Sequence, residues 1–83
     1  MSKEDVKTYV AHRRVEIGQR IKEERINCGW SQEKAAEIMG CTRVTFTRVE
    51  AGTAELTVLE LEYLAQALGV SVQIFHRSES QPK

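Results

Sequence analysis

The side chains best suited to binding chemistry gather in one short stretch, TRVTFTR, which runs from Thr42 to Arg48. A guanidinium group carries several donors in a fixed plane, and a hydroxyl group both donates and accepts. The two arginines and three threonines therefore suit hydrogen bonding to a polar partner. The sequence has no comparable set of side chains for catalysis, because no nucleophile stands beside a base and no phosphate-binding loop is present. His12 and His76 are isolated and receive no role. An enzyme is disfavoured.

The two cysteines indicate a reducing compartment. Cys28 and Cys41 lie thirteen positions apart, with no CxxC motif and no histidine at metal-ligand spacing. Each falls where a small apolar residue would fit, which predicts buried free thiols. The sequence contains no apolar run typical of a signal peptide or of a membrane span. We expect a cytoplasmic protein with no metal, cofactor or membrane partner.

Composition restricts the architecture to one small domain. The chain has 83 residues, of which 41% are hydrophobic, enough for a single core. The formal net charge is zero, so overall charge is no argument for a nucleic-acid partner. The charge is uneven, however, because residues 1–30 carry seven basic and five acidic side chains, whereas residues 54–83 carry two and four. Most of the basic side chains therefore lie early and in the middle of the chain.

The spacing of apolar residues predicts helices almost throughout. A helix is expected from about Glu16 to Asn27, with Gly29 just past its end. Three further helices each begin after a hydroxyl N-cap and end at a glycine: Ser31 to Gly40, Thr42 to Gly52 and Thr57 to Gly69. The TVLE sequence after Leu56 is a capping box. The chain is therefore predicted to form a compact, all-α, five-helix domain.

The two ends of the chain are less regular. Residues 1–14 form an N-terminal extension whose few apolar residues leave helix and coil open, and the main domain covers residues 15–77. The sequence VSVQIFHR near its end suits a short helix capped by Ser71, although its β-branched residues also permit a strand. Residues 78–83 are expected to form a flexible tail.

The residues from Ser31 to Gly52 have the features of a helix-turn-helix. Two helices that cross closely need a small residue at the crossing, which Ala36 provides. The turn between them needs a left-handed residue, which Gly40 can supply without steric cost. Apolar side chains after the turn would hold the second helix on the first: Cys41, Phe46 and Val49.

The opposite face of that second helix is predicted to point into solvent. Its residues are Arg43, Val44, Thr47 and Arg48. A helix held with one such face outward can enter the major groove of DNA.

The sequence from Ile17 to Ser71 resembles the DNA-binding domains of the lambda repressor/Cro (Xre) family. The resemblance is carried by IGQRIKEERINCGW, SQEKAAEIMGCTRVTFTRVEAG and LTVLELEYLAQALGVS, in that order. It implies a lambda-repressor-like fold and a sequence-specific transcriptional regulator. Its simplest form is a repressor that binds double-stranded DNA as a homodimer at an inverted repeat.

The resemblance also implies roles for single residues. Gln32, the first residue of the second helix, would contact a phosphate, which a helix N-terminus favours. Base edges would be met by Arg43, Val44 and Arg48. This suits their chemistry, because arginine can bond guanine bidentately and a valine methyl group can pack on that of thymine. Small hydroxyl side chains would face the DNA backbone or bases at Thr42, Thr45 and Thr47.

Two further roles are structural. The resemblance implies that Arg25 and Glu50 pair between the first helix and the end of the third, although both could be ordinary surface charges. Trp30, just before the Ser31 cap, is expected to pack at the helix entrance rather than to stack on a base.

The sequence departs from the family pattern near the second turn. Leu56 replaces a common proline, which affects only the turn. Glu55 stands in a loop where many members carry basic or amide residues, and Ala51 has no side-chain donor. Fewer phosphate contacts and a more modest affinity for DNA are expected.

The sequence allows more than one kind of protein partner and more than one partner surface. A dimer interface is expected at three apolar residues near the C-terminus: Val72, Ile74 and Phe75. The N-terminal extension is the other surface available for a dimer, and a purely internal role of the three residues is a further alternative. The same fold would also suit a DNA-binding antitoxin that holds a toxin on a second surface. A third hypothesis is a protein-interaction module. Such a module would have no need of the arginines in the helix from Thr42 to Gly52, called the reading helix below.

Overall fold

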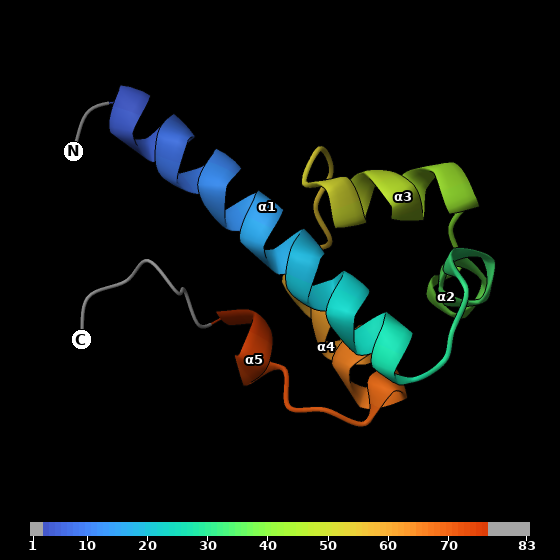
Figure 1. The fold of residues 1–83 in the computed structure, drawn as a ribbon. Helices are drawn as coiled ribbons and strands as arrows, with labels where there is room; N and C mark the ends of the chain where they lie inside the picture. Colours follow the sequence, from blue (N-terminus) through green and yellow to red (C-terminus); the bar gives the residue numbers. More distant parts are fainter. Residues whose placement is uncertain (1–2, 77–83) are drawn as a thin grey trace.

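The computed structural model describes residues 3–76, which form five α-helices and, within that range, no strand. The helices are α1 Lys3–Asn27, α2 Gln32–Met39, α3 Arg43–Ala51, α4 Val58–Leu68 and α5 Gln73–His76 (Figure 1). The predicted all-α, five-helix architecture is confirmed. The choice left open for the C-terminal segment is decided in favour of a helix. Arg77 and the tail predicted for residues 78–83 lie outside the described residues.

Helix α1 is much longer than the helix predicted from Glu16. It has 25 residues without a break, and its first half projects beyond the other helices (Figure 1). At 1.5 Å per residue it is about 37 Å long, which accounts for most of the 39 Å longest extent of the molecule. Once the packed second half has formed, each added residue extends a helix without a new nucleus. The few apolar residues in the first half therefore indicate exposure and not loss of helix.

The helix boundaries follow from the caps. The hydroxyl groups of Ser31, Thr42 and Thr57 each accept a hydrogen bond from the backbone N–H three residues later. The backbone N–H of Thr57 in turn donates to the Glu60 carboxylate, which completes the predicted capping box. Gly40 has a φ of 69°, as the turn after α2 requires. The three internal N-caps are confirmed.

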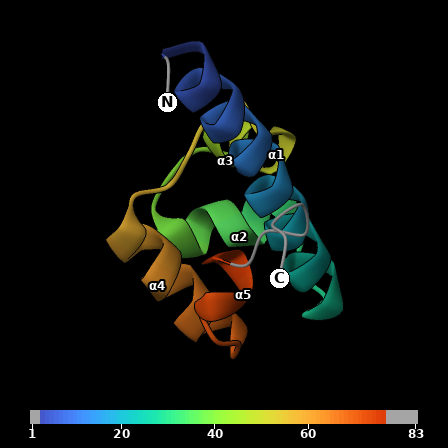
Figure 2. The same cartoon turned by 90° about the vertical axis from the view of Figure 1, so that its left-hand side faces the viewer.

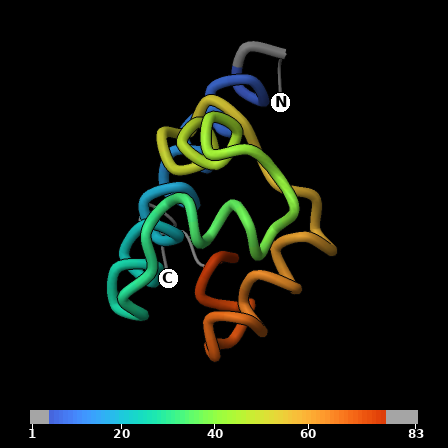
Figure 3. Tube along the Cα trace, turned by 90° about the vertical axis from the view of Figure 1, so that its right-hand side faces the viewer, coloured from blue at the N-terminus to red at the C-terminus, as the bar shows by residue number. Residues whose placement is uncertain are grey.

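The core lies where α2 crosses between α3 on one side and α4 and α5 on the other (Figures 2 and 3). Its buried members are Ile21, Ala35, Ala36, Phe46, Val49, Leu61, Leu64, Ala65, Leu68 and Phe75. Trp30 is half-buried against this core, as predicted for a residue at a helix entrance.

Helix α1 crosses the end of α3 at Gly18, a residue for which the sequence alone suggested no role. Gly18 is buried, and a Cβ atom there would lie 2.6 Å from the Glu50 carbonyl oxygen and closer still to that of Val49. The two backbones therefore meet without room for a methyl group. In the sequence, the signal for this close approach is an isolated glycine inside a helical pattern.

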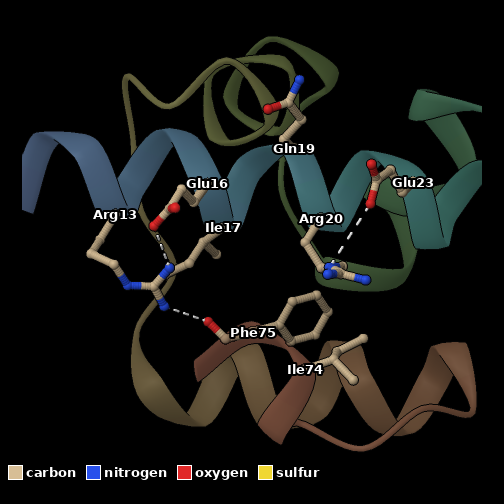
Figure 4. Close-up of a pocket in the computed structure, with 8 residues that line it drawn as sticks. All are labelled: Arg13, Glu16, Ile17, Gln19, Arg20, Glu23, Ile74 and Phe75. Atoms are coloured by element: carbon tan, nitrogen blue, oxygen red, sulfur yellow. Dashed lines mark hydrogen bonds and ion pairs between the residues drawn. The ribbon is translucent and has the colours of Figure 1, made fainter. Parts of the chain in front are cut away.

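Phe75 is 1% exposed and belongs to the core, so its assignment to a dimer interface was wrong. Its backbone carbonyl accepts a hydrogen bond from Arg13 Nη2 at 2.7 Å, and Arg13 also pairs with Glu16 (Figure 4). The aromatic ring thus closes the core between α5 and α1, which a small domain with few large apolar residues needs. Val72 and Ile74 are half-buried and pack against the same core.

The prediction of two buried thiols was wrong for Cys28, which is exposed, whereas Cys41 is half-buried. Cys28 follows the last residue of α1, where helical spacing no longer determines which way a side chain points. Its Sγ lies 3.5 Å from the Leu68 carbonyl oxygen. Cys41 packs against the core, and burial, with a smaller effect of Glu60, raises the pKa of its thiol.

The two thiols should therefore react at different rates. At pH 7.5 we expect iodoacetamide to modify Cys28 several times faster than Cys41, because Cys41 is less accessible and burial raises the pKa of its thiol. The measurement is the rate of mass change in Cys28→Ser and Cys41→Ser variants, native and in urea. The rates should converge in urea. Equal native rates would contradict the difference in exposure.

Candidate nucleic-acid interface

Helices α2 and α3 form the predicted helix-turn-helix. Ala36 is buried at the crossing, and the N–H of Cys41 donates to the Ala36 carbonyl at 3.0 Å across the turn. Phe46 and Val49 are buried on the inner face of α3. Helical periodicity then directs the residues between them outward. The structural roles predicted for Ala36, Gly40, Phe46 and Val49 agree with their positions.

The outer face of α3 carries the residues expected to meet DNA bases. Val44 is 62% exposed, and Arg48 and Thr47 are also exposed. Together with Arg43 they line one shallow depression on the outside of the helix: Arg43, Val44, Thr47 and Arg48. The structure thus brings four of the seven predicted DNA-contacting residues together on one surface.

Thr42 and Thr45 are exposed at the N-terminal end of α3 and bind each other. The Thr42 hydroxyl accepts from the Thr45 N–H at 3.1 Å and lies 3.1 Å from the Thr45 hydroxyl. Capping is therefore the first role of Thr42, and a DNA contact from either hydroxyl would be an additional one.

Arg25 and Glu50 form a buried ion pair behind this surface. Arg25 Nε lies 2.6 Å from Glu50 Oε2, and Nη2 lies 3.2 Å from Oε1. Each residue is 9% exposed. Arg25 Nη1 also donates to the Trp30 carbonyl at 2.8 Å, which ties the start of α2 to the end of α1. The predicted pairing of α1 with α3 is present, and the surface-charge alternative does not hold.

Gln32 connects the buried pair to the outer face of α3. Its amide nitrogen donates to Glu50 Oε1 at 2.9 Å, and its amide oxygen accepts from the Thr47 hydroxyl at 3.1 Å. This chain of contacts from Arg25 to Thr47 was not foreseen from the sequence. It fixes the orientation of Thr47. The amide nitrogen carries a second hydrogen, which leaves a donor for a phosphate.

Two weaker ion pairs flank the surface. Arg43 lies 3.5 Å from Glu33 of α2, with both side chains exposed. Arg14 of α1 lies 3.5 Å from Glu55 in the loop before α4. Arg14 thus brings a guanidinium group to the loop whose own sequence lacks a basic residue. Only the tertiary structure places it there.

A metal site and a membrane span find no support in residues 3–76. No cluster of histidine, cysteine, aspartate or glutamate side chains could hold a metal ion among these described residues. None of the described helices is long and apolar enough to cross a membrane.

Comparison with known proteins agrees with this geometry. A family model described as a helix-turn-helix domain matches residues 16–74, which include α2, α3 and the turn between them. The chain belongs to the helix-turn-helix family. Domains of this family are the DNA-binding parts of transcriptional regulators and are not enzymes. The structural neighbours place this one with the lambda repressor/Cro (Xre) type.

Three similar proteins illustrate the relationship. The restriction-modification controller protein C.AhdI from Aeromonas hydrophila has a TM-score of 0.71 and 31% identity, covering 78% of this chain and 94% of that one. SinR, a master regulator for biofilm formation solved with DNA, has a TM-score of 0.66 and 31% identity, covering 74% and 98%. YonR of Bacillus subtilis, a prophage-derived uncharacterized helix-turn-helix regulator, is 39% identical over 55 residues, or 66% of this chain. The match spans 51% of YonR.

Proposed function

We propose that this helix-turn-helix domain represses transcription by binding an inverted-repeat operator as a homodimer, with α3 in the major groove. The observation that carries the proposal is the outer face of α3. It presents two arginines and a valine to solvent, and the inner face is anchored by Phe46 and Val49. We infer that it acts in the cytoplasm of a bacterium, encoded by the bacterium, a phage or a plasmid, because similar regulators come from Aeromonas hydrophila and from a prophage of Bacillus subtilis.

The contacts divide into two kinds. Arg43, Val44 and Arg48 would read base edges, because their side chains lie on the exposed face. Gln32 would hold a phosphate at the N-terminus of α2 with its second amide hydrogen, and Arg14 would add a cation beside the α3–α4 loop. Thr42, which caps α3, and Thr45 would contact the DNA backbone.

Two copies are needed for useful affinity. One reading helix covers only a few base pairs, and the domain has no net charge that would add sequence-independent binding. A two-fold pair would place its α3 helices in successive major grooves, about 34 Å apart. The proposed contact involves Val72 and Ile74, which are half-buried, but no longer Phe75.

The proposal is tested by measuring affinity for an operator selected from random duplexes and for a scrambled duplex. Arg43→Ala and Arg48→Ala should each weaken operator binding by about 1–3 kcal/mol per half-site and relax discrimination at particular bases. Gln32→Ala should weaken binding to both duplexes, because a phosphate contact carries no base information. Sedimentation equilibrium of the complex should give two protein copies per operator.

A matched control removes a positive charge elsewhere. Lys22 is exposed on α1, so Lys22→Ala should leave the operator-to-scrambled ratio unchanged. If both arginine variants keep the wild-type ratio at constant salt, α3 is not the reading element. A single copy on the operator would contradict the homodimer.

An antitoxin is the second candidate, and the N-terminal half of α1 supports it. That half precedes the family match and exposes Val6 and Tyr9, which offer apolar surface to a protein partner. A toxin-like gene beside this one would favour the antitoxin. A pure protein-interaction module is less well supported, because it would not need the exposed arginines of α3.

A further inference from the structure

Val44 is an unexpected residue for the outer face of α3. It is 62% exposed on a helix where alanine, lysine or glutamine would be better helix formers. Its branched side chain contributes nothing to the core at that position. Branching at Cβ does, however, restrict χ1 in a helix to essentially one rotamer, so the two methyl groups have fixed positions. A rigid pair of exposed methyl groups suits contact with another apolar group.

The surroundings of Val44 sharpen that expectation. The depression on α3 is lined by Val44 and Thr47, with Arg43 and Arg48 beside them. The Thr47 hydroxyl is already used in its bond to Gln32 at 3.1 Å, which leaves its methyl branch as the remaining end of the side chain. The depression therefore combines an apolar floor with two guanidinium groups. The ion pair of Arg43 with Glu33 is exposed and therefore easily exchanged for another partner.

The major groove offers one small apolar group, the C5-methyl group of thymine. In 5-methylcytosine the methyl group occupies the same ring position and the same edge of the groove. Guanine supplies the N7 and O6 acceptors that arginine prefers. Arg48 follows Val44 by one helical turn, about 6 Å along the axis. Base pairs stack every 3.4 Å or so, so the two side chains reach bases at most about two steps apart.

We propose that Val44 and Thr47 read the C5-methyl group of a pyrimidine that has a guanine within about two base pairs, and that 5-methylcytosine replaces thymine at this position. The inference rests on the proposed function and adds the chemical class that the reading face selects. Methylation of cytosine at this position would therefore strengthen binding. A protein surface on which the methyl group clashed would instead lose affinity on methylation.

The experiment uses the full chain and an operator selected from random duplexes. Each thymine is replaced in turn by deoxyuridine, which lacks only the methyl group. One thymine position in each half-site should be sensitive to this change. Removing its methyl group should weaken binding about fourfold in one half-site and about 15-fold in both. Changing that T·A pair to C·G should weaken binding, and 5-methylcytosine in the same place should restore about the same factor. All measurements are made at one salt concentration.

Two variants assign the effect to its residue. Val44→Ala should distinguish thymine from deoxyuridine operators clearly less well than the wild-type chain, because only the Thr47 methyl branch and one alanine methyl group remain to contact the C5-methyl group. Val58→Ala is the matched control, since Val58 is 64% exposed at the first position of α4 and outside α3. It should keep the full discrimination of the wild-type chain.

The outcomes separate this inference from the proposed function. If an operator is selected but no thymine can be distinguished from deoxyuridine, the methyl-reading inference is wrong and the regulator survives. The inference is also wrong if Val44→Ala still discriminates as the wild-type chain does. If no duplex is enriched over the scrambled control, the proposed function itself fails, and the inference fails with it.

Discussion

Replacing Arg25 with alanine is expected to lower the free energy of unfolding by about 3–5 kcal/mol. The substitution leaves the Glu50 carboxylate buried without its cation, and the side chains of the pair are only 10% and 4% exposed. The total free energy of unfolding of a domain of this size is roughly 4–12 kcal/mol, at about 0.05–0.15 kcal/mol per residue. The variant should therefore be largely unfolded at low urea concentrations. Urea denaturation followed by circular dichroism measures the effect.

The chain supplies a matched control in its exposed ion pair. Glu33 and Arg43 lie 3.5 Å apart with side chains 75% and 62% exposed, so Glu33→Ala should cost less than about 1 kcal/mol. The double variant Arg25→Met/Glu50→Leu should be more stable than Arg25→Ala alone, because it leaves no unpaired charge. An Arg25→Ala midpoint equal to that of Glu33→Ala would mean that the pair is not desolvated.

Gly18→Ala is expected to lower the free energy of unfolding. Helix propensity alone would predict the opposite, an increase in stability. In an open helix this substitution stabilises by up to about 1 kcal/mol. Here the new methyl group would overlap backbone carbonyl oxygens of α3, which cannot rotate away as a side chain can. Helices α1 and α3 must then separate, and overpacking of this kind costs about 1–3 kcal/mol.

The neighbouring position provides the comparison. Gln19 is exposed on the same turn of α1, so Gln19→Ala should change stability by no more than about 0.5 kcal/mol. Because Gly18 contacts the end of the reading helix, Gly18→Ala should also weaken operator binding at temperatures where the protein stays folded. A melting temperature equal to or above that of the wild-type chain would show that the crossing has room for a methyl group.

The sequence by itself determined the features that depend on neighbours along the chain. Ser31, Thr42 and Thr57 could be recognised as caps, because each binds a backbone N–H only three residues away. Gly40 marked the turn, since a left-handed residue is a local requirement. The 3.6-residue period placed Phe46 inside and Val44 outside α3. The resemblance to the Xre family supplied the pairing of Arg25 with Glu50, which no local pattern contains.

The tertiary structure decided everything that depends on which surfaces meet. Phe75 closes the core because α5 folds back on α1, and Cys28 is exposed because the chain turns away after Asn27. Gly18 matters only because α3 crosses α1 at that residue. Gln32 links Glu50 to Thr47 only because two helices bring them within hydrogen-bond distance. Local sequence selects backbone dihedral angles and helix faces, but contacts between helices depend on packing among residues far apart in the chain.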